Sequence, residues 1–200
     1  SRGLVGSEMC IRDRSAYIAA RNAEDGISFL QAAESALLEI AALNVRMREL
    51  AVQKTSGLLQ TAESNAIGAE ETAIDTAADT IAAYKFNGTA LLGATVNITD
   101  DLDGGVFAVG STNTPAIAAT RTVADSKMAE IQKDLGNVAA GMAGLKGIQA
   151  ALYSLSANSE AAASRLMDTD FAYSSAQLAK FTVLNPVSYT HLRAHETSGY

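Results

Sequence analysis

Few side chains in this sequence could carry out chemistry, and most of them lie at its two ends. The single cysteine is Cys10, and the two histidines are His191 and His195. Cys–His and Ser–His–Asp nucleophiles need a histidine, and zinc sites of the usual kind need Cys and His ligands. Residues 15–185 contain neither residue type. The sequence therefore predicts a protein that is not an enzyme, with no catalytic residue, no metal site and no cofactor.

Two groups of aspartates are the remaining candidates for acid–base or calcium chemistry. Asp168 and Asp170 are two residues apart with no third ligand cluster near them. We interpret them as structural, with an aspartate capping the helix that follows. Residues 100–104 faintly resemble a calcium loop, but no Glu stands at the closing position that such a loop requires. Turn formation explains this segment better.

Composition narrows the class of protein further. Hydrophobic residues make up 48% of the 200 residues, yet aromatic residues make up only 6% and there is no Trp. Such an Ala- and Leu-rich composition favours long, closely packed helices. No apolar run of about 18 residues is present, so we expect no membrane insertion. The formal net charge of −7, with few basic clusters, argues against nucleic acid as a partner.

A heptad seam indicates a first long helix, expected at about residues 16–54. Its apolar positions follow one another in steps of three and four residues, which is the period of a coiled coil. The members are Leu30, Ala33, Leu37, Ile40, Asn44, Met47 and Ala51. Asn44 is the one polar member, and such a residue can fix register at some cost in stability. A second helix is expected at about 63–83, where Ile67, Ile74 and Ile81 recur every seven residues.

The same pattern returns near the C-terminus in a third helical segment. Its seam runs through Ala124, Met128, Ile131, Leu135, Val138, Met142, Leu145, Gln149 and Leu152. Four glycines interrupt it, at positions 136, 141, 144 and 147. Each costs about 1 kcal/mol relative to Ala in a helix interior, so either backbones approach closely there or the segment is soft. A break is expected near 167–169, followed by a last helical piece at 172–183.

Between the second and third helices the pattern changes to short strands. Asn87-Gly88 is a strong turn signal. Residues 96–98 alternate between apolar and polar, a turn is expected at 103–105, and residues 106–109 read as a returning strand. We therefore expect a small hairpin region at about 86–115.

Together these elements predict a mainly α fold, an elongated antiparallel helical bundle or coiled coil with a small β-hairpin region. Neither long seam can bury its apolar stripe alone, so the first and third helices should pair and the second should complete the bundle. The residues expected in the core of this rod are Leu30, Leu37, Ile40, Met47, Met128, Ile131, Leu135, Val138, Met142, Leu145 and Leu152.

The two ends of the chain look foreign to this pattern. Residues 1–14 and 185–200 show neither helical nor strand periodicity, and both resemble translated sequencing adapter; two ordinary disordered termini are the alternative. The domain organisation expected from sequence is thus a disordered leader at 1–14, a helical domain at 15–184 and a disordered tail at 185–200.

Three motifs, in order, carry a resemblance to a known family. They are Arg-Asn-Ala-Glu-Asp-Gly-Ile-Ser at 21–28, Arg-Met-Arg-Glu-Leu-Ala-Val-Gln at 46–53, and Ser-Arg-Leu-Met-Asp-Thr-Asp-Phe-Ala at 164–172. The chain resembles bacterial flagellin, the subunit of the flagellar filament. This implies a secreted, extracellular structural protein of the bacterial flagellum that self-assembles for swimming motility. Flagellins also carry terminal helices that form an inner tube; because these are not recognisable here, we expect a middle fragment.

The resemblance also implies partners and an interface. Expected partners are other flagellin subunits, the flagellar export machinery and its chaperone, and the Toll-like receptor that senses flagellin. Candidate residues for the subunit interface or receptor recognition are Arg46, Glu49, Leu50 and Gln53. The acidic partner position on the second helix falls near Ala69 or Glu70. From the residues alone, Arg46 and Glu49 have a simpler interpretation, a solvated salt-bridging face.

Two other functions remain open at this point. One is the flagellar hook–filament junction protein, whose rod resembles that of flagellin, although Phe86-Asn87-Gly88 followed by Leu91-Leu92 favours flagellin. The other is an intracellular helical signalling or adaptor bundle, such as a chemoreceptor coiled coil. The hairpin region and the short heptad runs argue against it.

Overall fold

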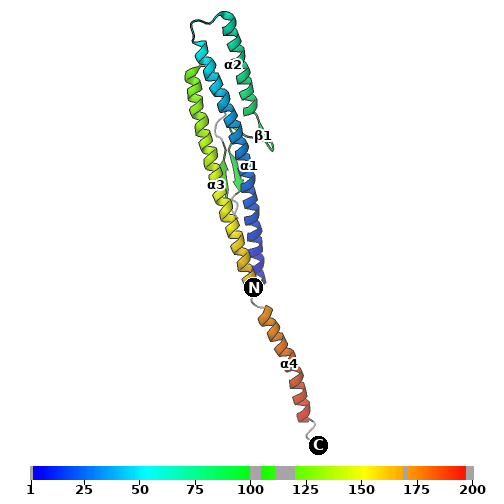
Figure 1. The fold of residues 1–200 in the computed structure, drawn as a ribbon. Helices are drawn as coiled ribbons and strands as arrows, with labels where there is room; N and C mark the ends of the chain where they lie inside the picture. Colours follow the sequence, from blue (N-terminus) through cyan, green and yellow to red (C-terminus); the bar gives the residue numbers. More distant parts are fainter. Residues whose placement is uncertain (1, 100–104, 111–119, 169–170, 197–200) are drawn as a thin grey trace. The chain divides into compact units, whose positions relative to one another are not determined.

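A computed structural model describes residues 2–99, 105–110, 120–168 and 171–196. Its helices are α1 (Arg2–Lys54), α2 (Thr61–Ala82), α3 (Arg121–Asp168) and α4 (Phe171–Glu196). The chain forms two compact units, one of residues 16–153 and one of residues 1–15 with 154–200. The mainly helical architecture expected from the sequence, with a long helix pair and a few short antiparallel strands, is confirmed (Figure 1).

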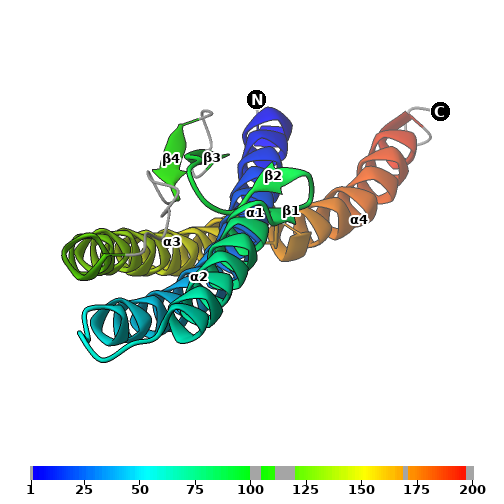
Figure 2. The same cartoon turned by 90° about the horizontal axis from the view of Figure 1, so that it is seen from above.

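Within the unit of residues 16–153, α1 and α3 pack antiparallel. Gly26 of α1 lies against Leu145, whereas Asn44, further along α1, reaches back to Ala124 near the start of α3. A tight turn after α1 sends α2 back along it, and Figure 2 shows α2 running beside α1. The backbone N–H of Gln60 donates to Glu63 Oε2 at 3.0 Å. This hydrogen bond gives a partner to one of the backbone N–H groups that are free where α2 begins.

The core of this unit follows the seam of the first helix. All seven seam members are buried: Leu30, Ala33, Leu37, Ile40, Asn44, Met47 and Ala51. From α2, Ile74 and Ala78 pack into the same core, with Ile67 and Ile81 partly buried against it. Burial of these apolar side chains is what stabilises three helices that would be marginal in isolation.

The α3 face differs from the expected seam. Every second member is buried, namely Ala124, Ile131, Val138, Leu145 and Leu152. The alternate members Met128, Leu135, Met142 and Gln149 are only half-buried, while Asp134 and Gly141 on the opposite flank are buried. The helix is therefore rotated toward its glycine-bearing flank. The physical reason is close approach: a Cβ at position 141 would lie 3.1 Å from Leu30 Cδ1.

The strands form two small antiparallel pairs. In the first, β1 (Lys85–Phe86) pairs with β2 (Thr89–Ala90) around Asn87 and Gly88, whose φ angles of 48° and 84° suit a type I′ turn. In the second, β3 (Val96–Thr99) pairs with β4 (Val106–Val109), as the alternation predicted. The turn expected at 103–105 falls mostly on residues outside the described ranges.

Glycines on both long helices receive the side chains of the β3–β4 pair. A Cβ at Gly26 of α1 would lie 3.0 Å from Ile98 Cγ1, and a Cβ at Gly144 of α3 would lie 2.7 Å from Phe107 Cζ. In contrast, a Cβ at Gly136 or Gly147 would meet no other described atom within 4 Å. Of the two explanations for the glycines of α3, close approach therefore applies to Gly141 and Gly144 only.

At both ends the structure differs from the expectation of disorder. Where α1 was expected to begin near residue 16, it begins at Arg2, and α4 continues to Glu196 rather than ending near 183. Extending an existing helix adds a hydrogen bond for each residue fixed, so a helix propagates through segments that could not start one. None of the side chains at 7–14 is buried. The expected break is present, with α3 ending at Asp168, while the capping position at Asp170 lies outside the described residues.

The part of α1 from Ser7 to Lys54 is long and apolar enough to cross a membrane, judged by its length and composition alone. This property was not predicted from the sequence. In its most apolar window, 44% of the residues are buried inside the protein. Its apolar character is thus accounted for in large part by the seam.

Candidate subunit-interface face

A ridge of apolar side chains runs along the outside of α1. Leu38, Val45 and Val52 are 54%, 47% and 46% exposed and lie seven residues apart. Seven residues are about two helical turns, so these side chains project in nearly the same direction. Each follows a buried seam member by one residue, which turns it roughly 100° away from the core. We call these three residues the α1 ridge.

An ion-pair network borders the ridge on the side of α2. Arg46 Nε donates to Glu70 Oε1 at 2.7 Å, and Arg46 Nη1 donates to Glu49 Oε2 at 3.0 Å. The hydrogen bond that Arg46 donates to Glu70, followed by the one that it donates to Glu49, raises the pKa of Arg46 above its already high usual value. Both pairs are about half-exposed, so salt screens them. Their structural effect is to hold the guanidinium across the α1–α2 boundary.

Two further ion pairs tie α1 to its neighbours. Arg48 Nε donates to Asp125 Oδ1 of α3 at 2.6 Å, and Lys54 Nζ donates to Glu71 Oε2 of α2 at 2.6 Å. Arg46 and Arg48, which lie on the two sides of the ridge, are therefore paired within the unit. A partner that covered the ridge would bury apolar surface next to charges that already have partners.

The residues singled out from the sequence divide between the surface and the core. Arg46, Glu49 and Gln53 are exposed on α1. Leu50 is 1% exposed and belongs to the core, so its side chain is not available to a partner. This corrects its assignment as an interface candidate, and the reason is that position 50 faces the core shared with α2.

Sequence reasoning located the acidic partner of Arg46 only to Ala69 or Glu70, and the structure identifies Glu70. It missed the α1 ridge. The available signal was a second seven-residue repeat, offset by one position from the seam.

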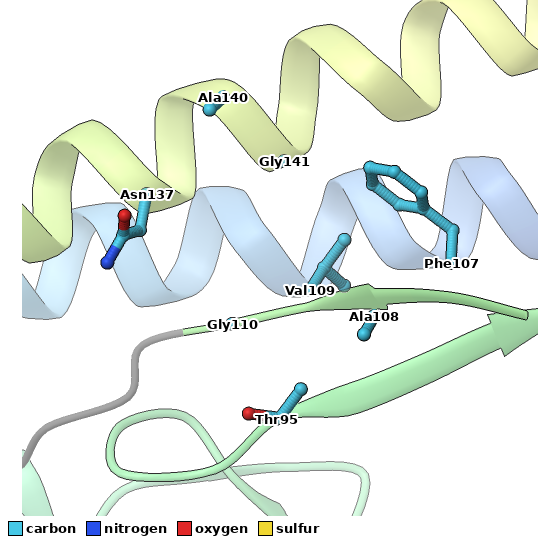
Figure 3. Close-up of a pocket in the computed structure, with 8 residues that line it drawn as sticks. All are labelled: Thr95, Phe107, Ala108, Val109, Gly110, Asn137, Ala140 and Gly141. Carbon is cyan, nitrogen blue, oxygen red and sulfur yellow. The ribbon is translucent and has the colours of Figure 1, made fainter.

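A hollow of about 350 Å³ lies between β4 and α3. Figure 3 shows Val109 and Phe107 pointing toward α3, with Asn137 and Thr95 as polar side chains near one end. No carboxylate, histidine or cysteine lines it. In the described parts of the chain, no group of three or more His, Cys, Asp or Glu is arranged to hold a metal ion.

Comparison with known proteins places these features in a family. Residues 12–97 match the family model described as the bacterial flagellin N-terminal helical region. Over these residues the chain is similar to the bacterial flagellins. The matched residues contain the α1 ridge, the Arg46 network and all of α2.

Individual relatives agree with this assignment. The chain is 32% identical over 117 residues to Flagellin D of Vibrio cholerae serotype O1, covering 58% of this chain and 29% of that relative. It is 37% identical over 92 residues to Polar flagellin B/D of Vibrio parahaemolyticus serotype O3:K6, covering 46% and 24%. The chain thus spans less than a third of the length of these relatives. A crystal structure of Bacillus cereus flagellin superimposes with a TM-score of 0.45 at 20% identity, covering 70% of this chain and 88% of that one.

Proposed function

We propose that this chain is a structural subunit of the bacterial flagellar filament that assembles with other flagellin subunits and serves swimming motility, not catalysis. The observation that carries the proposal is the match of residues 12–97 to the flagellin N-terminal helical region. That match includes α1 from residue 12 onward and all of α2. The exposed faces of these two helices are available for contact between copies of the chain.

The α1 ridge supports side-by-side packing as the mechanism. Three large aliphatic side chains at a fixed spacing offer apolar area, and covering it favours association. Because Arg46 and Arg48 are already paired on either side, a neighbouring subunit would not have to bury an unpaired charge. The interface would then resemble common protein interfaces, with an apolar centre and a polar rim.

We further propose the finer expectations that family membership implies. The subunit is exported through the flagellar machinery with its chaperone and functions outside the cell. Recognition by the flagellin-sensing Toll-like receptor would involve Arg46, Glu49 and Gln53, which are exposed. It would not involve the side chain of Leu50, because that side chain is buried.

Mass spectrometry of filaments sheared from the source bacterium tests the function. We expect peptides from residues 16–153 to be among the abundant peptides of the filament fraction. Their enrichment in the hook–filament junction fraction would instead identify a junction protein. Their confinement to the cytoplasm would identify an intracellular adaptor, and either result would overturn the proposal.

Charged substitution of the ridge tests the mechanism. Val45→Lys with Val52→Lys, introduced into the chromosomal gene, should shorten or abolish filaments and remove swimming, because two ammonium groups would be buried without partners at the subunit contact. The thermal midpoint of the purified variant should stay within about 2 °C of the parent, since exposed substitutions usually change stability by less than about 0.5 kcal/mol.

The control is Thr76→Lys, which adds one ammonium group on the exposed face of α2 where the ridge variant adds two on α1. Full-length filaments from the double ridge variant would exclude the ridge as a contact surface. Equal loss from the ridge variant and from Thr76→Lys would show a general charge effect instead.

A further inference from the structure

The α3 helix has two faces that could pack on α1, and the structure uses the less apolar one. Both faces share Ala124, Ile131 and Val138. One adds Met128, Leu135 and Met142, and the other adds Lys127, Asp134 and Gly141. Asp134 is 2% exposed and Gly141 is buried, whereas Leu135 and Met142 are half-buried. A rotation of α3 by roughly 50° about its axis would exchange the two flanks. Apolar burial alone would favour that rotation.

Two glycines of α3, against which side chains of other elements pack closely, oppose the rotation in the middle of the helix but not at its start. Gly141 and Gly144 receive Leu30, Val109 and Phe107, which fixes the helix where the β3–β4 pair lies. The first three turns of α3 lie beyond those two glycines. There, Asn44 and Arg48 of α1 make polar contacts with α3.

Asn44 contacts the backbone of α3 at Ala124, a fully buried residue with a small side chain. Its Nδ2 donates to the carbonyl oxygen of Ala124 at 2.8 Å. Ala124 is the smallest of the five buried residues that recur every seven positions on α3. One turn further along α1, Arg48 Nε holds Asp125 at 2.6 Å. Two successive turns of α1 thus hold two adjacent residues of the first turn of α3.

The burial of Asn44 is costly, which argues that its role is positional. Asn44 is 1% exposed, and its Oδ1 is buried with no hydrogen-bond partner among the described residues. A buried polar atom without a partner destabilises a fold, and an apolar residue would fill the same seam position without that cost. A buried asparagine in a helical seam is known to trade stability for a unique arrangement.

We infer that Asn44, assisted by Arg48, is a positioning residue that selects which face of α3 packs on α1 over residues 121–135. It holds Ala124 against α1, and so keeps Leu135 only half-buried and Asp134 buried. This inference does not depend on the proposed filament function, because it concerns the packing of a single chain.

Two cysteine probes on opposite flanks test the inference in the full chain carrying Cys10→Ser. Leu135→Cys and Lys127→Cys are introduced separately, and the rate of reaction with a maleimide is measured for each. In the Asn44→Leu background we expect the probe at 135 to react at least threefold more slowly and the probe at 127 at least threefold faster. The thermal midpoint should be equal or higher. Arg48→Ala, at an exposed position, should shift both rates in the same directions by a smaller factor.

Ile40→Leu is the matched control, because it changes the same seam one turn earlier without touching a polar group. It should leave both labelling rates unchanged. Opposite changes at the two probes report rotation, which a loosened fold would not produce. Unchanged rates at either probe in both the Asn44→Leu and Arg48→Ala backgrounds would overturn the inference. So would an increase at both probes with a lowered midpoint, because Asn44 would then only stabilise the fold.

Discussion

Leu37→Ala is expected to lower the free energy of unfolding by about 2–5 kcal/mol, the range measured for large-to-small changes in close-packed cores. Leu37 is fully buried and ranks among the largest fully buried side chains of the described structure. It lies between Leu30, which touches Gly141 of α3, and Asn44, which reaches Ala124. Truncation therefore leaves a cavity in the contact between the two long helices, where neither backbone can collapse freely.

Urea denaturation followed by circular dichroism at 222 nm measures this change. The matched control is Leu38→Ala, one residue further along the same helix, where the side chain is 54% exposed. The control should change stability by less than about 0.5 kcal/mol. Comparable losses at positions 37 and 38 would show that the seam does not separate core from surface.

The contrast between positions 37 and 38 is also what the sequence alone could predict. Steps of three and four residues identify one face of a helix because 3.6 residues complete a turn. That regularity located the seam of α1, while apolar–polar alternation located the strands at 96–98 and 106–109 and the Asn-Gly pair located the turn at 87–88. These features depend on local spacing, so no tertiary contact is needed to find them.

The rotation of α3 could not be obtained in the same way. Local spacing predicted that Leu135 and Met142, and not Asp134 and Gly141, would face the core. The reason is that a heptad pattern takes only the apolar character of each residue into account. In the middle of α3 the observed face is set by partners distant in sequence: Leu30 and Val109 at Gly141, and Phe107 at Gly144. A glycine in a helix can signal either weakness or room for a close neighbour, and its sequence context did not distinguish Gly136 from Gly141.

The candidate interface shows the same limit. The Arg46–Gln53 motif located the correct helix, and the structure places three of its four named residues at the surface. Leu50 was misassigned because a motif does not say which face of a helix α2 will cover. Glu70 became identifiable only once α2 had folded back along α1, with 24 residues separating it from Arg46.

Glycines with different surroundings should respond to the same substitution with opposite signs. Gly110→Ala is expected to destabilise the chain by about 2–3 kcal/mol. Gly110 follows β4 with a φ of 137°, a region that L residues rarely adopt, and an added Cβ would overlap the backbone carbonyl oxygen of Ala94. Because the obstacle is backbone, a side-chain rotation cannot relieve it.

Gly147→Ala supplies the opposite case in the interior of α3, where an added Cβ would meet no other described atom within 4 Å. Alanine favours a helix over glycine by about 1 kcal/mol, so this variant should gain roughly 0.5–1 kcal/mol. Both variants can be compared with the parent by urea denaturation. If Gly110→Ala were neutral, the end of β4 would adapt without cost and would not fix the β3–β4 pair against α3. If Gly147→Ala were destabilising, an added methyl would meet a contact there, and open space could not explain the glycine. The predicted opposite changes in the free energy of unfolding would then fail. That prediction requires that some glycines leave room for a close neighbour, while others only weaken the helix.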